Sequence, residues 1–315
     1  MLAAAFLGKR LTMTIPVMAI VAVIVFAILR MSPGDPAIIM AGDNASPEQL
    51  AEIRRHMGLD QPIYIQFVVW LGQVLRGDFG TSLISNVPVI DVVSARIGPS
   101  LALGLSTMVL SVVVAIPLGV LAAWSRGTML DKAVVWFSVI VFSVPVFVVG
   151  YLLAWIFAVE LGWLPVQGYR PLSSGLWNFG ERLILPTVAL STIYIALIAR
   201  ITRSSVIEVM GEDFIRTARA KGLRESAVLI SHALGNAAVP IVTIIGIGVA
   251  MLIGGVVVTE SVFNIPGLGR LVVEAVLARD YPVIQALILL FALANVGINL
   301  AVDMLYTLFD PRIRH

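Results

Sequence analysis

Six long runs of uncharged, mostly apolar residues constrain the fold of this chain more than any other feature. A helix rises about 1.5 Å per residue, so runs of about 17 residues or more reach across the hydrocarbon layer of a membrane. With 59% hydrophobic and 13% charged residues, the chain is also far more apolar than a soluble protein. The sequence therefore predicts an all-α integral membrane protein with six transmembrane helices. The runs cover residues 11–29, 98–123, 133–159, 183–199, 235–259 and 283–302.

The runs divide the chain into three parts. Residues 1–30 hold an N-terminal segment and the first span, which we expect to be retained because no Ala-x-Ala-like cleavage site follows it. Residues 31–97 form a polar insertion with small helices of its own, and residues 98–315 hold the other five spans. In the insertion, Ser46 and Gln49 predict a capping box and Gly58 a helix stop.

A second helix of the insertion is predicted from Pro62 to Leu75, with an apolar stripe at helical spacing. The stripe consists of Phe67, Trp70, Leu71 and Val74. We expect this helix to lie on the membrane surface or on neighbouring spans.

The distribution of basic residues predicts the orientation. The loops 126–132 and 200–224 lie on the same side of the six runs as Lys9 and Arg10, and the second loop is rich in arginine and lysine. Positive charge in short loops marks the cytoplasmic side. Both termini are therefore predicted to be cytoplasmic and the insertion extracytoplasmic.

The absence of charged residues from the six runs argues against several function classes. None of the six runs contains Asp, Glu, Lys, Arg or His, which argues against a proton-driven carrier or an intramembrane enzyme. The chain has no Gly-x-x-x-x-Gly-Lys-Ser/Thr loop to bind nucleotide phosphates, no cysteine, and three histidines without metal-ligand spacing. A net charge of +2 is too small to indicate nucleic acid. A passive channel remains an alternative, because pores need no charges.

The polar residues inside the runs are candidates for a translocation path. We single out Asn295 and Asn299, which are four apart on one helical face, together with Ser138 and Ser143. Hydrogen bonding between helices is the other explanation for each of them.

The segment 212–235 is predicted to fold as helix, turn and helix on the cytoplasmic side. Gly222 ends the first helix in a left-handed conformation, and a second helix starts after it. Glu212 and Arg216 are spaced as a surface ion pair. The predicted packing residues are Phe214, Ile215 and Ala218 in the first helix and Ala227, Val228 and Ile230 in the second.

This segment resembles the loop that couples the membrane subunits of ATP-binding-cassette importers to their ATPases. Ala218, Gly222 and Leu234 match that pattern, and the stretch 216–223 is similar to the version in peptide and nickel permeases. The residues that depart from the pattern are Arg216, Thr217, His232 and Gly235. The resemblance implies that residues 203–234 form a coupling loop. Its residues are Arg216, Thr217, Ala218, Arg219, Lys221, Gly222, Leu223, His232 and Leu234.

Four further stretches carry the same resemblance to the dipeptide, oligopeptide and nickel permeases. They are 33–37, 58–62 continuing to 77–82, 263–270 continuing to 279–282, and 310–314. The resemblance implies a type I importer fold and partners: a second homologous permease, two cytoplasmic ATP-binding subunits that hold ATP and Mg²⁺, and an extracytoplasmic solute-binding protein. No cofactor is expected in this chain.

The implied solute is a peptide, with nickel complexes, glutathione or another small solute as alternatives. Because the spans lack fixed charge, we expect the path to bind the solute weakly and the loop after the fifth run to receive it and control access. The residues of this gate loop are Glu260, Phe263, Pro266, Gly267, Arg279 and Asp280.

Overall fold

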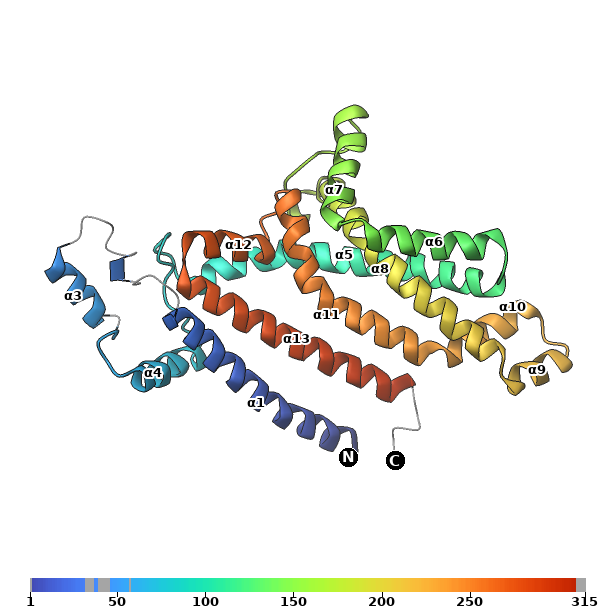
Figure 1. The fold of residues 1–315 in the computed structure, drawn as a ribbon, viewed down its shortest axis with the longest axis horizontal. Helices are drawn as coiled ribbons and strands as arrows, with labels where there is room; N and C mark the ends of the chain where they lie inside the picture. Colours follow the sequence, from blue (N-terminus) through green and yellow to red (C-terminus); the bar gives the residue numbers. More distant parts are fainter. Residues whose placement is uncertain (1, 32–36, 39–45, 57, 310–315) are drawn as a thin grey trace. The chain divides into compact units, whose positions relative to one another are not determined.

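A computed structural model describes residues 2–31, 37–38, 46–56 and 58–309 of the chain (Figure 1). Over those residues the protein is helical, and one antiparallel bridge, between Thr81 and Pro88, is the only extended pairing. Four of the described helices are long and apolar enough to cross a membrane, or five spans if one bent pair is counted as a span. The four are α5 (Val89–Trp124), α8 (Leu176–Met210), α11 (Ala238–Val262) and α13 (Tyr281–Phe309).

The first predicted span lies in α1 (Leu2–Met31), whose described apolar part is the shorter segment Thr12–Ala27. The all-helical membrane architecture predicted from the runs is thus confirmed.

The predicted span 133–159 is bent rather than straight. It is divided into α6 (Met129–Ser143) and α7 (Val146–Ala154), which continues as a π-helix, η1 (Trp155–Glu160). The two halves meet at an angle of 98°. Pro145 explains the break, because the residue before a proline is driven out of the helical region, and Val144 has the extended angles φ −108° and ψ 122°.

Most of the long helices extend beyond the uncharged runs, so ionisable residues enter helices although they are absent from the runs. Arg200 and Arg203 belong to α8, Glu260 to α11 and Asp303 to α13. These charges lie toward the helix ends, where polar partners are within reach, rather than at mid-span.

The chain forms two compact units, and each is described by itself. The first consists of residues 1–98 and 270–296. It contains α1, α3 (Pro47–His56), α4 (Ile63–Leu75) and most of α12 (Leu268–Ala278). The predicted capping box is confirmed: the Gln49 N–H donates to Ser46 Oγ at 3.3 Å and the Ser46 N–H to Gln49 Oε1 at 3.0 Å. Gly58, the predicted helix stop, lies just after α3 and has a φ angle of +63°.

The helix α4 packs against α1 through aromatic rings. Phe26 of α1 lies 5.3 Å from Phe67 and 5.5 Å from Trp70, measured between ring centroids. Another stripe of α4, which includes Tyr64, Val68 and Leu75, stays exposed. The helix therefore has one apolar side on a neighbouring span and a second that the chain leaves uncovered.

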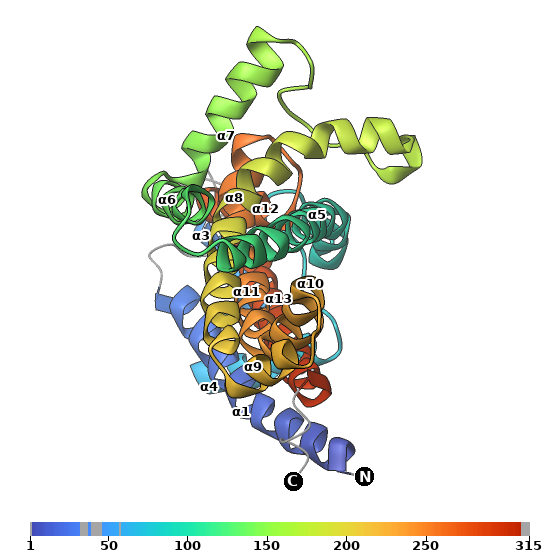
Figure 2. The same ribbon diagram turned by 90° about the vertical axis from the view of Figure 1, so that its right-hand side faces the viewer.

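The second unit consists of residues 99–269 and 297–315, and α8 packs at its centre against α5, α6, α7 and α11. Gly119 permits a close approach of α5 to α8, because a Cβ there would lie 2.6 Å from the Ala199 carbonyl oxygen. Figures 1 and 2 show α6 beside α8, α7 turning sharply away from α6, and the short helices α9 and α10 at the far end of α8. The helix α8 is thus surrounded by other helices of its unit, and the chain leads from its end into the predicted coupling segment.

Candidate functional site

The predicted coupling segment begins where α8 ends at Met210. It contains α9 (Asp213–Ala220), the single turn α10 (Glu225–Ala227) and the π-helix η3 (Val228–Leu234), and it leads into α11. Gly222, at φ +77°, ends α9. Its N–H donates to the Arg219 carbonyl at 2.9 Å and the Leu223 N–H to the Ala218 carbonyl at 3.4 Å, the paired bonds of a Schellman motif. The predicted turn is confirmed.

One face of α9 is buried. Ile215 is 0% exposed and Ala218 7%, but Phe214, expected on the same face, is 42% exposed. In an eight-residue helix beside its neighbours, only the positions three apart face inward. Phe214 therefore presents its ring outward, and its predicted role in packing was wrong.

The second half of the segment is also anchored by a narrow face. Val228, Leu229 and Ala233 are buried, whereas Ile230, which we expected to pack, is 62% exposed. The reason is the π-helical winding, in which hydrogen bonds join residues five apart and positions 228 and 233 fall on one side.

These buried residues join one cluster with the ends of three long helices that lie next to the segment. The cluster comprises Val120 and Ala123 of α5, Val206 of α8, Ile215 and Ala218 of α9, Val228, Leu229 and Ala233 of η3, Ala237, and Ile241 of α11. Side chains of α9 thus share one buried cluster with residues of α5, α8 and α11.

Charged side chains cover the outside of the segment. Arg216 pairs with Asp213 at 3.1 Å. We expected it to pair with Glu212, but Glu212 precedes α9 and has an extended backbone conformation. The Arg219 guanidinium donates to the Glu225 carboxylate at 2.7 Å and 3.3 Å, which joins α9 to α10 across the turn. That hydrogen bond raises the pKa of Arg219 above its ordinary value.

The remaining predicted coupling residues divide into two groups. Thr217, Lys221 and Leu223 are exposed, while His232 and Leu234 are half-buried. The outer face therefore combines basic groups with two exposed apolar side chains, Phe214 and Leu223. Such a mixture is typical of a surface that a protein partner covers.

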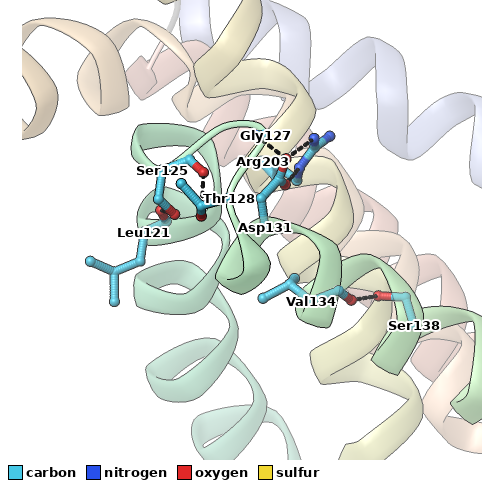
Figure 3. Close-up of polar contacts among 8 residues, drawn as sticks. All are labelled: Leu121, Ser125, Gly127, Thr128, Asp131, Val134, Ser138 and Arg203. Atoms are coloured by element: carbon cyan, nitrogen blue, oxygen red, sulfur yellow. Dashed lines mark hydrogen bonds and ion pairs between the residues drawn. The ribbon is translucent and has the colours of Figure 1, made fainter.

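An ion pair that the sequence analysis missed lies nearby, between α6 and α8 (Figure 3). Arg203 Nε and Nη2 donate to the two carboxylate oxygens of Asp131, the second at 2.9 Å, and the Gly127 N–H donates to Asp131 Oδ2 at 2.9 Å. The Asp131 side chain is only 7% exposed. The available signal was an aspartate in the first turn of a helix, a pattern too common to indicate a specific partner.

At the other end of α11, the predicted gate loop folds around a buried carboxylate. Glu260 is 0% exposed and accepts a hydrogen bond from Ser100 Oγ of α5, which in turn accepts the Leu268 N–H at 2.7 Å. A Cβ on Gly267 would lie 2.0 Å from Glu260 Oε1. Phe263 is 2% exposed, and Pro266 is half-buried.

The other two predicted gate residues belong to the first unit. Arg279 has φ +54° and is exposed. Asp280 is 5% exposed and accepts hydrogen bonds from Ser82 Oγ at 2.5 Å and from the Leu83 N–H at 3.2 Å. Asp280 therefore fastens the end of the insertion to the start of α13.

The predicted path residues lie in different surroundings. Ser138 is buried and donates to the Val134 carbonyl at 3.0 Å and to the Ala196 carbonyl at 3.3 Å, so it joins α6 to α8. Ser143 is exposed and donates to the Val139 carbonyl at 2.9 Å within its own helix. Asn295 and Asn299 are both exposed on one face of α13.

Comparison with known proteins identifies the family. Residues 115–315 match the profile of the binding-protein-dependent transport system inner membrane component, and residues 2–103 match the N-terminal profile of such membrane components. The chain belongs to this permease family. A probable peptide ABC transporter permease of Sinorhizobium fredii is 52% identical over 310 residues, covering 98% of this chain and 99% of its own length.

Other relatives of this permease differ in their named solute. A glutathione transport system permease of Salmonella typhimurium is 44% identical and covers 98% of both chains. A putative peptide transport system permease of Brucella abortus is 43% identical and covers 99% of both. An inward-facing structure of the MetNI methionine ABC transporter has a TM-score of 0.58, covering 70% of this chain and 97% of its own, at 18% identity. That likeness shows the fold.

Family membership confirms the resemblance on which the sequence analysis relied. Two of the quoted stretches, 33–36 and 310–314, lie outside the described residues.

Proposed function

We propose that this chain is the membrane-spanning permease subunit of an ATP-driven importer that takes up peptides across the bacterial inner membrane. Family membership and relatives named as peptide permeases support the transport role. The observation that carries the coupling role is the geometry of residues 212–235. A buried inner face ties the segment to three long helices, and an exposed basic and apolar outer face is available to a partner.

The energy for transport comes from partners. Two cytoplasmic ATP-binding subunits supply ATP and Mg²⁺, a second homologous permease completes the path, and an extracytoplasmic protein captures the solute. Movement of the ATPases displaces α9, and the cluster around Ile215 passes the displacement to α5, α8 and α11.

Reconstitution tests this function and distinguishes it from a channel. Proteoliposomes containing the permease with its partners should accumulate labelled dipeptide only with ATP on the cytoplasmic side. Liposomes that contain the permease alone should be impermeable to the dipeptide. Passage of the solute through the chain alone would establish a channel and refute the proposal.

We propose a peptide as the solute, rather than a nickel complex or glutathione, because two of the compared relatives are named as peptide permeases. The uncharged runs offer no partner for the charged ends of a peptide, so specificity resides in the solute-binding protein and the path binds weakly. Calorimetry on the permease pair without its receptor should detect no binding at concentrations that saturate the receptor. Tight binding that Asn295→Leu abolishes would place specificity in this chain.

The orientation follows from the basic loops, with both termini cytoplasmic and the insertion extracytoplasmic. The chain has no cysteine, so single cysteines report position without background. Cysteines at the exposed positions Gln49 and Leu172 should react with a membrane-impermeant maleimide from outside, and one at Arg216 only from the cytoplasm. Labelling of the Leu172 position from the cytoplasmic side alone would reverse the topology.

The exposed stripe of α4 supports a place for this helix in the outer leaflet of the bilayer. At 13 residues α4 is too short to span, it carries no charge, and it leans on Phe26 near the end of the first apolar run. A spin label at Val68 should be more accessible to oxygen than to a water-soluble nickel reagent, and a label at Gln73 should show the reverse. Equal access of the nickel reagent to both positions would place the helix in water.

A further inference from the structure

The ion pair between Asp131 and Arg203 joins α6 to α8. Only α8 also contributes a residue to the cluster beneath α9. The cluster beneath α9 contains residues of α5, α8 and α11. The helix α6 reaches the same end of the unit through Arg203, which lies two turns before the end of α8. Any displacement of α8 by α9 therefore has a direct polar connection to α6.

The pair is built to fix orientation as well as distance. Two nitrogens of the guanidinium donate to two oxygens of one carboxylate, and such a bidentate contact resists rotation as well as separation. The Gly127 N–H adds a third bond, which includes the loop before α6 in the same contact (Figure 3). Burial of the Asp131 side chain excludes the water that would compete for these bonds.

A second polar contact repeats the connection farther along the two helices. Ser138 lies about two turns beyond Asp131 on α6, and the Ala196 carbonyl that it reaches lies about two turns before Arg203 on α8. The two helices run antiparallel, so the contacts form successive rungs of one interface. Beyond the second rung, α6 reaches its break at Val144 and Pro145, where α7 begins at 98°.

We propose that Asp131 and Arg203 are positioning residues that make α6 move as one body with α8 when the coupling segment is displaced. Nothing in the family match assigns this role, and it rests on the proposed function because the displacement comes from the ATPases. Through the pair, a displacement of α8 also displaces α6, from the loop at Gly127 toward the bend at Pro145. Loss of the pair uncouples α6 while leaving the docking surface on α9 unchanged.

The first experiment measures coupling in the complete transporter in proteoliposomes. The variants are Asp131→Asn, Arg203→Gln, Arg203→Lys and the double variant Asp131→Asn with Arg203→Gln. Thr128→Ala is the matched control, because Thr128 lies in the same loop and donates to the Ser125 carbonyl, away from the pair. The measured quantity is the number of ATP molecules hydrolysed per peptide taken up.

Asp131→Asn and Arg203→Gln should each raise that ratio by about fivefold to tenfold, as expected when a coupling element is lost. The double variant should be no worse than the single ones, because both substitutions remove the same contact. Arg203→Lys, which keeps the charge but loses the bidentate geometry, should lie between them and the wild type. A role in stability alone would lower uptake and hydrolysis together and leave the ratio unchanged, and that result would overturn the proposal.

The second experiment does not depend on transport. Spin labels at the exposed positions Leu130 of α6 and Ser204 of α8 report the distance between the two helices in the assembled complex, with and without nucleotide. The wild-type distance should be the same in both states, and Asp131→Asn should broaden it in the nucleotide-bound state. A wild-type distance that differs between the states would refute a common movement. If the wild-type complex shows no ATP-driven uptake, the proposed function fails, while this distance still tests the pair.

Discussion

The chain reaches α11 through the exposed turn at Gly222 and leaves it through the buried loop that contains Gly267. Gly222 has φ +77° and no atom within 4 Å of a built Cβ, so its requirement is conformational. At Gly267 a Cβ would lie 2.0 Å from the buried Glu260 carboxylate, so its requirement is space. Gly222 and Gly267 both belong to stretches that carry the family resemblance, yet they serve different physical purposes. The first sets the turn between α9 and α10, and the second permits a tightly packed loop.

The charged groups of the two regions also differ in how far they are exposed to water. Around Gly222 the ion pairs lie on the surface, where water weakens them. Around Gly267 a carboxylate is fully buried beside Ser100, and the residues expected to meet a solute are largely covered. The end of α11 next to Gly222 thus adjoins an exposed, charged surface, whereas Glu260 and Phe263 at the other end are buried and would meet a solute only after a rearrangement.

The largest expected effect is that of Gly267→Ala. The added methyl group overlaps the Glu260 carboxylate, and overpacking of a closed site costs about 3 kcal/mol. The thermal unfolding temperature of the purified permease should fall, and uptake should be lost. Gly254→Ala is the matched control, because no atom lies within 4 Å of its built Cβ.

A second substitution sharpens this prediction. Glu260→Ala in the Gly267→Ala background removes the overlapping atoms and should restore part of the lost stability. If the double variant is less stable than Gly267→Ala alone, the contact between these two residues is not the cause of the defect.

In the predicted coupling segment, Ile215→Ala and Phe214→Ala should separate stability from coupling. Ile215 is fully buried in the cluster, so its truncation should cost about 2 kcal/mol or more. Phe214 faces outward, so its truncation should leave the unfolding temperature nearly unchanged but reduce peptide-stimulated ATP hydrolysis. Equal losses of stability in both variants would contradict the assignment of an inner and an outer face.

Gly222→Val should have a smaller effect on stability, of about 1 to 2 kcal/mol, because it forces an L-residue into the left-handed region. Uptake should fall while the protein still inserts into the membrane. Gly222→Asn should retain more uptake than Gly222→Val, since asparagine tolerates that conformation. Wild-type transport by the valine variant would show that the turn does not transmit force.

The sequence could predict most of the fold because uncharged runs and turn residues act locally. The runs placed the long helices, Ser46 and Gln49 predicted a capping box, and Gly222 predicted the end of α9. The break at Val144 was missed although Pro145 was visible, because a proline in a membrane helix is often accommodated without a break.

The tertiary contacts of the candidate site could not be predicted in the same way. Asp131 and Arg203 are 72 residues apart, and Ser100 and Glu260 are 160 residues apart, so only the packing of α5, α6, α8 and α11 brings them together. On the buried face of η3 only Val228 was predicted correctly, because the predicted spacing assumed an α-helix where the chain forms a π-helix.

The smallest effect is expected at the Arg219–Glu225 pair, which crosses the turn at Gly222. Both side chains are more than a third exposed, so Arg219→Gln should leave the unfolding temperature nearly unchanged. Because the folded pKa of Arg219 is raised, its contribution is present below the unfolded pKa and is lost only as the pH rises through the folded value. Arginine titrates above about pH 12, so the pair should add no pH dependence between about pH 6 and pH 9. Peptide-stimulated ATP hydrolysis by Arg219→Gln, measured across that range and at increasing salt, should keep the wild-type pH profile. A large loss of stability would show that α10 depends on this pair rather than on the buried residues Val228 and Leu229.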